Sequence, residues 1–384
     1  MISKGHKKHA GLTRPSLGNF NRNEWAFVGG QCNAIKALAG EIIGVLSANY
    51  KCAYADTSHN NDKMLPGRLV NGAVMEVTDE IDYRVVNDTA PFNSFKSTAI
   101  FSGVDVVLVN GNHQQANAQV VIICESKKAS LQKRLAQLTN VQMLLLAEGA
   151  AEVFDFIKEA VPDWSSIPIY GMDETEKIIG FFQNKMALAK PVLNGLVLAG
   201  GKSERMGFDK GMVNWHGKEQ RYYLADLLVP FCDDVFISVR KGMEQEIDPY
   251  YSSLPDTFTG LGPFGAILSA FREKPDNAWL VIACDLPLIN AGTLQYLMAN
   301  RNTATIATAY QSGTDGFPEP LIAIWEPRSY PVLLSFLAQG YSCPRKVLIN
   351  SETTLLNAPQ PGDLTNVNTP EEFEQVQHLL QQTY

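Results

Sequence analysis

A glycine-rich segment with three cations is the part of the sequence best suited to chemistry. It reads LAGGKSERMGFDK from Leu198 to Lys210. The paired glycines Gly200 and Gly201 let the backbone approach a phosphate closely and direct its N–H groups at the oxygens. Positive charge where a triphosphate would lie comes from Lys202, Arg205 and Lys210. A glycine turn after a strand is also a common strand-to-helix corner, so the prediction of a phosphate-binding loop rests on the whole string.

A lone carboxylate at the end of an apolar run is the second candidate. Asp285 follows WLVIAC and precedes Leu286 and Pro287. Open α/β sheets bind ligands at the carboxyl ends of their strands, and Mg²⁺ takes one or two carboxylates together with phosphate oxygens of the substrate. Asp285 is therefore predicted to be the protein's Mg²⁺ ligand. The alternative is an ordinary turn or helix N-cap residue.

Together these segments resemble the molybdenum cofactor guanylyltransferases and their near relatives in the nucleotidyltransferase superfamily. Every fixed position of the family's loop LAGGxSxRMGxDK is present, and CDLP resembles the family's metal-binding strand end. The residues that this resemblance places against the nucleotide are Leu198, Ala199, Gly200, Gly201, Lys210 and Asp285. Those to which it gives catalytic roles are Arg205, Lys210 and Asp285.

Two further segments resemble family motifs, with departures that bear on the base and the acceptor. Asp256 precedes GLGPFGAILSAF and by resemblance contacts the nucleotide, although FGA at 264–266 replaces the family's leucine, small residue and glycine. After DVFISV the family places an asparagine near the nucleotide, where this chain has Arg240. Near the C-terminus DLTNVNTP resembles the closing N-x-N-T-P motif. Its Asn366 and Asn368 either orient a polar substrate or satisfy the turn before the last helix.

The reaction implied by the resemblance joins the terminal phosphate of molybdopterin, with or without its metal, to the GMP part of GTP and releases pyrophosphate. A phosphate monoester is largely ionised at neutral pH because its second pKa is about 6, so this nucleophile needs no general base. The expected partners are GTP and molybdopterin or molybdenum-molybdopterin, with Mg²⁺ as cofactor. Two alternatives stay open: a cytidylyl- or other nucleotidyltransferase acting on a related phosphorylated acceptor, and a catalytically decayed binding or adapter protein for molybdenum cofactor synthesis.

Apolar runs that alternate with helix-like segments predict an α/β chain of two domains, each a mostly parallel sheet covered by helices. A fresh buried strand begins after Lys190-Pro191, which divides the chain into a flexible basic tail (1–23), a first domain (24–190) and a Rossmann-like nucleotidyltransferase domain (191–384). Thr369, Pro370 and Glu372 form a capping box that begins the last helix. Strands of the second domain are expected at 193–198, 234–239, 279–283, 304–309 and 321–325.

The first domain more faintly resembles the P-loop-type adapter protein that accompanies the guanylyltransferase. The P-loop pattern G-x-x-x-x-G-K-[ST] is degenerate, since Ile35 and Ala37 replace its second glycine and its hydroxyl residue. Asn110 and Asn112 stand where the adapter has a glutamate. We expect this domain to bind GTP poorly or not at all, and to dock a molybdoenzyme or cofactor-synthesis protein or to deliver cofactor. Its expected strands are 25–28, 51–55, 104–110, 120–124, 141–146 and 167–170, and its helices 33–48, 131–138, 150–161 and 175–182.

Composition excludes several classes of partner. A net charge of −8 argues against a surface built to hold nucleic acid. The six cysteines show no C-x-x-C pair and are expected to be reduced structural thiols. No uninterrupted apolar stretch reaches about 18 residues, so we expect no membrane span and, by default, a cytoplasmic location.

Overall fold

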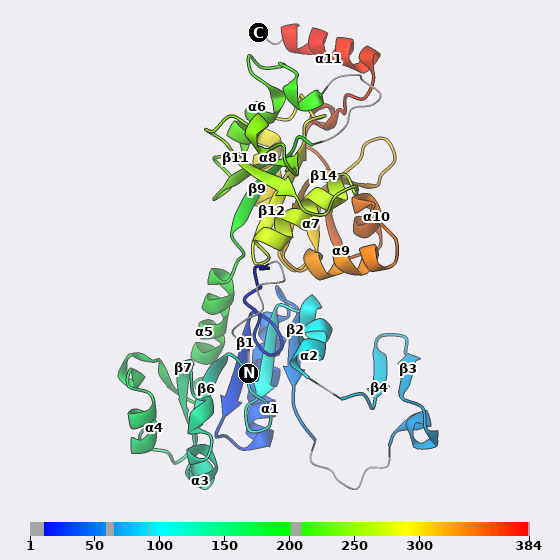
Figure 1. Cartoon of the computed structure of the whole chain (residues 1–384). Helices are drawn as coiled ribbons and strands as arrows, with labels where there is room; N and C mark the ends of the chain where they lie inside the picture. Colours follow the sequence, from blue (N-terminus) through cyan, green and yellow to red (C-terminus); the bar gives the residue numbers. More distant parts are fainter. Residues whose placement is uncertain (1–10, 59–64, 92, 201–208, 383–384) are drawn as a thin grey trace. The chain divides into compact units, whose positions relative to one another are not determined.

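The computed structural model of the chain describes residues 11–58, 65–91, 93–200 and 209–382, and it divides into two compact units (Figure 1). One unit comprises Leu17–Ala189, and the other comprises Lys190–Tyr384 together with Met1–Ser16. The division between Ala189 and Lys190 adjoins the expected boundary after residue 190. We call these the N-terminal and the C-terminal unit and treat each by itself.

The end of the segment predicted to be a flexible tail is packed, which corrects that part of the prediction. Phe20 and Asn21 are buried. The carboxylate of Glu24 accepts the backbone N–H groups of Asn19, Phe20 and Asn21 at 2.6–3.0 Å. Burial of an aromatic ring and capture of three peptide groups by one carboxylate hold this stretch in place.

The N-terminal unit is built on a parallel six-stranded sheet whose order is β2-β5-β1-β6-β7-β8. Its central strands are apolar on both faces, as expected where helices cover both sides. Helices α1 and α5 pack on one face and α3 and α4 on the other. The strands are β1 (Glu24–Val28), β2 (Cys52–Ala55), β5 (Val106–Asn110), β6 (Ala118–Ile123), β7 (Val141–Leu146) and β8 (Ile169–Gly171). The helices are α1 (Cys32–Leu46), α2 (Ser94–Ile100), α3 (Lys128–Gln132), α4 (Asp155–Ala160) and α5 (Thr175–Leu188).

A separate antiparallel hairpin lies between β2 and β5 in the sequence. It consists of β3 (Met75–Asp79) and β4 (Arg84–Asp88), preceded by the 3₁₀ turn η1 (Gly67–Asn71). The loop that joins the two strands contains only four residues, of which Glu80 donates its N–H to the carbonyl of Tyr83. The sequence analysis did not predict this hairpin.

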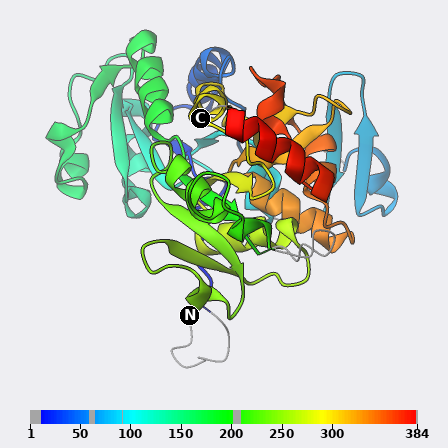
Figure 2. The same cartoon turned by 90° about the horizontal axis from the view of Figure 1, so that it is seen from above.

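The C-terminal unit is built on a seven-stranded sheet of order β11-β10-β9-β12-β14-β13-β15. β9 to β12 run parallel, whereas β14 pairs antiparallel with both β12 and β13. Helices α6 and α8 cover one face of this sheet, and α7, α9 and α10 cover the other (Figures 1 and 2). Alternate residues of the central strands enter the two apolar cores under these helices. The strands are β9 (Leu193–Leu198), β10 (Val235–Arg240), β11 (Ser252–Asp256), β12 (Ala278–Ala283), β13 (Ala307–Gln311), β14 (Pro318–Trp325) and β15 (Thr353–Leu356). The helices are α6 (Gln220–Leu228), α7 (Pro263–Glu273), α8 (Ala291–Ala299), α9 (Ser329–Ala338), α10 (Pro344–Ile349) and α11 (Pro370–Gln382).

The predicted α/β class is confirmed, and so is the capping box of the last helix. Thr369 Oγ1 accepts the N–H of Glu372 at 3.3 Å, and Glu372 Oε2 accepts the N–H of Thr369 at 3.1 Å. The helix predicted at 131–138 is wrong as a continuous element, since α3 ends at Gln132 and only a 3₁₀ turn follows at Leu135–Gln137. Among the helices that the structure describes, none is long and apolar enough to cross a membrane.

Candidate functional site

The candidate site lies along the carboxyl edge of four neighbouring parallel strands in the C-terminal unit. In the register of the sheet Leu198 of β9 pairs with Ser238 of β10 and with Ala283 of β12. Arg240 of β10 pairs with Asp256 of β11. The strand ends thus bring together segments that the sequence separates by tens of residues. A single row of polar groups results at the edge where α/β sheets bind ligands.

Gly200 and Asp256 meet at one end of this row. A Cβ placed on Gly200 would lie 3.4 Å from the backbone nitrogen of Arg240 and 3.7 Å from Asp256 Oδ2. Ser238, which is buried, donates its hydroxyl to Asp256 Oδ1 at 2.7 Å and so fixes the carboxylate. Burial raises the pKa of Asp256, and the bond from Ser238 opposes that rise. The carboxylate is held facing the start of the predicted phosphate loop, in which Leu198 ends β9 and Ala199 follows it.

The middle of the predicted loop, residues 201–208, lies outside the described residues, and with it Gly201 and Arg205. The described structure resumes at Asp209, whose carboxylate accepts the N–H of Gly211 at 2.8 Å. This bond caps the 3₁₀ turn η6 (Lys210–Met212), which begins at Lys210.

Lys210, Asp285 and Asn368 converge at the other end of the row. Lys210 Nζ donates to Asn368 Oδ1 at 2.7 Å and lies 3.9 Å from Asp285 Oδ2. The backbone carbonyl of Asp285 accepts the N–H of Val367 at 2.9 Å, which joins the closing segment to the end of β12. Three predicted site residues from distant parts of the chain are therefore brought together, whereas Asn366 is exposed.

The electrostatics of Asp285 favour a cation. Burial raises its pKa, the ammonium of Lys210 opposes this rise, and the negative charge of Glu319 on the adjacent strand β14 adds to it. The ammonium of Lys210 lies 3.9 Å from Asp285 and donates to Asn368 instead, while the charge of Glu319 is paired with that of Arg345. A cation at the half-buried carboxylate of Asp285 would balance its charge. The residues present therefore fit Mg²⁺, with Asp285 as the protein ligand and substrate phosphate oxygens as the remainder.

The loop that carries Asp285 is fixed through three successive carbonyl groups. The carbonyl of Asp285 accepts from Val367, that of Leu286 accepts from the side chain of Gln220 at 3.3 Å, and that of Pro287 accepts from His216 Nε2 at 2.8 Å. His216 also stacks on Tyr223 with ring centroids 3.8 Å apart. The sequence analysis singled out neither His216 nor Gln220. No spacing signal links them to Asp285, because their targets are backbone atoms 66 and 71 residues away.

Comparison with known proteins places this site in a family. A profile described as a MobA-like NTP transferase domain matches residues 195–354. A probable molybdenum cofactor guanylyltransferase from Nostoc sp. is 30% identical over 189 residues, which cover 48% of this chain and 90% of that protein. The chain belongs to the molybdenum cofactor guanylyltransferase family. It is accordingly a nucleotidyltransferase.

Other relatives of this guanylyltransferase-family chain include longer proteins. A molybdenum cofactor biosynthesis bifunctional protein from Synechocystis sp. is 34% identical over 201 residues, and the chain spans only 58% of that protein's length. Among solved structures, molybdopterin-guanine dinucleotide biosynthesis protein A from Archaeoglobus fulgidus is 19% identical to this chain, with a TM-score of 0.42. The match covers 49% of this chain and 99% of the Archaeoglobus chain. A MobB protein homologue from Bacillus stearothermophilus is 17% identical, with a TM-score of 0.32. That match covers 43% of this chain and 99% of the Bacillus chain.

A small cavity adjoins Asp285 on the side of β14 in this guanylyltransferase-family chain. It has a volume of about 100 Å³, and its polar lining comes from Asp285, Glu319, Arg345 and Asn366. Arg345 donates to Glu319 Oε2 at 3.0 Å, which holds the carboxylate at the cavity wall. Asn366 thus lines the same cavity as Asp285.

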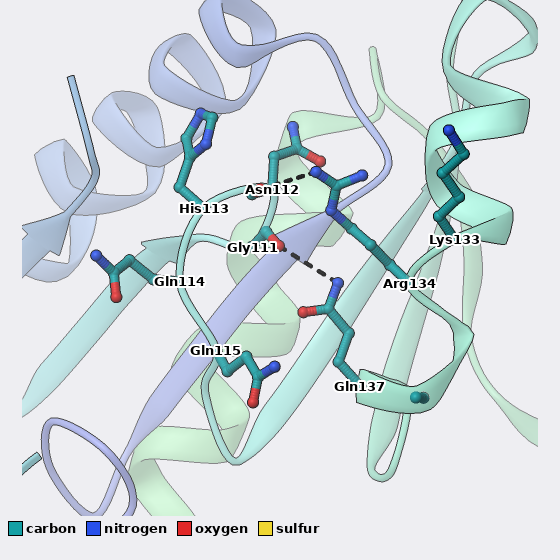
Figure 3. Close-up of a pocket in the computed structure, with 9 residues that line it drawn as sticks. Gly111, Asn112, His113, Gln114, Gln115, Lys133, Arg134 and Gln137 are labelled. Atoms are coloured by element: carbon teal, nitrogen blue, oxygen red, sulfur yellow. Dashed lines mark hydrogen bonds between the residues drawn. The ribbon is translucent and has the colours of Figure 1, made fainter. Parts of the chain in front are cut away.

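In the N-terminal unit, the side chain of Asn112 bonds the backbone at the start of the predicted degenerate P-loop. Asn112 Oδ1 accepts the N–H of Gly29 at 3.2 Å, and its Nδ2 donates to the carbonyl of Gly30 at 2.8 Å. Arg134 in turn donates to the carbonyl of Asn112 at 2.9 Å, beside a cavity of about 300 Å³ (Figure 3). Lys36 pairs with Asp56 at 3.5 Å rather than facing a free loop. The weak GTP binding expected of this unit stays a prediction.

Proposed function

We propose that the C-terminal unit transfers GMP from GTP to the terminal phosphate of molybdopterin or its molybdenum form, giving the guanine dinucleotide cofactor and pyrophosphate. The observation that carries the proposal is the convergence of Lys210, Asp285 and Asn368 beside the strand end that begins the LAGG loop. The relatives named molybdenum cofactor guanylyltransferase, such as the Nostoc protein, support this choice of substrates.

Each residue of the site has a different role in the proposed phosphoryl transfer. Gly200 leaves room for a phosphate at the end of β9, and Asp256 lies beside it on the nucleotide side of the row. Lys210 places its ammonium where charge grows on the leaving pyrophosphate, and its bond to Asn368 keeps it in position. Asp285 would hold Mg²⁺, which when bound supplies charge neutralisation for the triphosphate. The acceptor phosphate is already an anion, so no side chain needs to remove a proton from it.

The cavity between Asp285 and Arg345 lies on the opposite side of Asp285 from Gly200 and is the proposed place of the acceptor. Asn366 and Glu319 line it and offer polar partners to a heterocyclic substrate. Arg345 is already paired with Glu319 and with Asp315, so its role in this proposal is to orient Glu319.

The deciding experiment is a test of nucleotide selectivity with the purified full chain, Mg²⁺ and molybdopterin. GTP and CTP are supplied in turn, and both pyrophosphate and the dinucleotide product are measured. Product with GTP alone is the expected result. Product with CTP alone would assign the chain to a cytidylyltransferase on the same acceptor, the alternative that Arg240 keeps open. Nucleotide binding without product from either would favour a decayed adapter role.

A further inference from the structure

The cavity beside Arg134 in the N-terminal unit lies at the carboxyl end of β5 (Figure 3). One wall is the segment from Gly111 to Gln115, which follows β5 directly, and the other is the segment from Lys133 to Gln137, which follows α3. Open α/β sheets bind ligands beyond the carboxyl ends of their strands. The volume of about 300 Å³ is at the lower end of the range for small-molecule pockets. The cavity therefore suits a small ligand.

The guanidinium of Arg134 is fixed between the two walls. It donates to the carbonyl of Asn112 at 2.9 Å and to that of Ser130 at 2.8 Å. Asn112 is held in turn by its side-chain bonds to Gly29 and Gly30. The Nε N–H group of Arg134 makes no hydrogen bond with the part of the chain that the structure describes. A guanidinium fixed in this way offers a donor to a ligand at little further entropic cost.

The lining of the cavity carries two positive charges and no carboxylate. The second cation is Lys133, whose ammonium pairs with none of the described residues. Asp56 comes within 3.9 Å of His113 in the lining, but Lys36 pairs with that carboxylate at 3.5 Å. The whole chain, in contrast, has a net charge of −8. Two cations without a carboxylate beside them favour an anionic ligand.

Glutamine side chains provide most of the remaining polar lining. Figure 3 shows Gln115 on one side of the cavity and Gln137 with Arg134 on the other. Gln137 donates to the carbonyl of Gly111 across a long 3.4 Å, and the side-chain amide of Gln115 bonds none of the described residues. A primary amide has two N–H donors and an oxygen with two lone pairs. Both glutamines therefore keep donors and acceptors for the polar edge of a ligand.

We propose that this cavity binds a small organic phosphate monoester, with its phosphate at Lys133 and Arg134 and its polar body between Gln115 and Gln137. A monoester phosphate carries a charge of about −1.5 to −2 at neutral pH, which the two cations match. A nucleoside triphosphate carries more charge and binds with Mg²⁺, for which the lining supplies no carboxylate. The degenerate P-loop, from Gly30 to Ala37, does not line the cavity, so this site is separate from it.

Protection of Lys133 from acetylation locates the ligand. The full chain is treated with an amine-reactive acetyl ester, with and without ribose 5-phosphate or GMP, and mass spectrometry follows each lysine. Lys128 pairs with Glu125 outside the cavity and is the internal control. At about ten times its Kd, either monoester should slow acetylation of Lys133 about tenfold, because the free fraction falls in that proportion. Guanosine, which has no phosphate, should give no protection.

Substitutions test the two parts of the site by isothermal titration of the full chain with ribose 5-phosphate. Lys133→Met should raise the Kd by about tenfold, and it leaves the fold intact because Lys133 is exposed and bonds none of the described residues. Lys128→Met removes a cation from the same helix region and should leave the Kd unchanged. Gln137→Glu keeps the side-chain shape but adds a negative charge, and should weaken binding by about tenfold or more. Lys210→Ala, in the C-terminal unit, should have no effect on this Kd.

Four results would overturn the proposal. The first is acetylation of Lys133 that neither monoester slows. The second is binding that Lys210→Ala abolishes and Lys133→Met leaves intact, which would place the phosphate in the C-terminal unit. The third is stronger protection of Lys133 by GTP with Mg²⁺ than by either monoester, which would make the cavity a triphosphate site. The fourth is equal protection by inorganic phosphate, which would leave the two glutamines without a role.

Discussion

Lys210 Nζ donates to Asn368 Oδ1 at 2.7 Å, joining two residues that lie 158 positions apart in the chain. The same nitrogen is 3.9 Å from Asp285 Oδ2. Asn368 is in turn held by its backbone, since its N–H donates to Glu372 Oε2 at 2.6 Å in the capping box of α11. The cap of the last helix therefore positions the cation that we assign to the leaving pyrophosphate.

This relationship predicts unequal effects of removing its two members. Lys210→Ala removes a charge from the phosphates and should lower kcat/KM for GTP by about 100- to 1,000-fold. Asn368→Ala removes one positioning hydrogen bond and should lower it by about tenfold. Asn368→Asp retains the acceptor oxygen and should stay near the native value. Steady-state pyrophosphate release with GTP and molybdopterin measures all three. A larger loss in Asn368→Ala than in Lys210→Ala would instead make Asn368 a direct substrate contact.

The assignment of Asp285 predicts loss of transfer without loss of fold. Asp285→Asn keeps the shape of the side chain but removes the charge that would hold Mg²⁺, and should lower kcat by about a thousandfold. Removal of Mg²⁺ from the native protein with EDTA should have the same effect. Asp315→Asn removes a carboxylate that bonds Arg345 rather than a predicted metal ligand, so it is the control and should remain active. Circular dichroism checks the fold of each variant, and an active Asp285→Asn would contradict the metal assignment.

The strands nearest the site were predictable because their side chains are apolar on both faces. GLVL, which leads into the LAGG loop, and WLVIA before Asp285 are runs of the kind that a buried parallel strand requires. The strand β11 was missed because SSLPD contains two serines and a proline, which sequence patterns assign to turns. Its proline is compatible with a strand because β11 forms the edge of the sheet. Tertiary pairing with β10, rather than local preference, decides its structure.

The site was predictable only where side chains themselves carry the chemistry. Asp285 and Lys210 stand in a recognisable string, and their proximity follows from neighbouring strand ends. The placement of Asn368 on Lys210 depends on how α11 begins, which the capping box indicates but does not orient. His216 and Gln220 hold carbonyl groups, and any donor side chain at the right place would serve. Such contacts require no particular residue type or spacing, so the sequence does not reveal them.

Gly200 is predicted to be required by the substrate rather than by packing. A methyl group there would meet the nitrogen of Arg240 at 3.4 Å and Asp256 Oδ2 at 3.7 Å, both ordinary contacts. Gly200→Ala should therefore fold with unchanged thermal stability. It should raise the Kd for GTP by about tenfold or more, because the methyl group occupies the approach of a phosphate to the backbone. Isothermal titration of GTP in the presence of Mg²⁺ measures this. Unchanged affinity would place the phosphates away from Gly200.

The buried pair of Arg301 and Glu326 should be the most sensitive polar contact of the C-terminal unit. Arg301 donates to both carboxylate oxygens of Glu326, at 2.6 and 2.9 Å, and to the carbonyl of Pro191 at 3.0 Å. Both side chains are almost fully buried. Arg301→Ala leaves an uncompensated buried carboxylate and should cost about 3–5 kcal/mol. Replacing both residues by methionine should recover much of that loss, because no charge then remains in the core.

Amide hydrogen exchange in peptides from β12 and β14 reports the stability of this unit alone. Lys274→Ala breaks a surface pair with Asp234 and serves as the control, with an expected cost below about 1 kcal/mol. Equal losses in Arg301→Ala and Lys274→Ala would show that the buried pair contributes no more than a surface one.

Cys232 should be nearly inert to alkylation in the folded protein. Burial raises the pKa of its thiol from the ordinary 9.0 to about 12, and the charge of Asp233 adds to the rise. At pH 8 the thiolate fraction, and with it the rate of reaction with iodoacetamide, should fall about a thousandfold relative to an ordinary thiol. The exposed Cys343 in the same chain is the internal comparison, and mass spectrometry of the two peptides gives both rates. In urea the two rates should become equal.

The same shift predicts how stability depends on pH. Below pH 9 the Cys232 thiol is protonated in both the folded and the unfolded chain, so it adds no pH dependence. Between pH 9 and about 12 the unfolded thiol ionises while the folded one stays neutral, which favours the unfolded state and lowers the free energy of unfolding. Cys232→Ala should remove this component of the alkaline decline. Equal declines in the native chain and in Cys232→Ala would show that the thiol ionises as readily in the folded state as in the unfolded one.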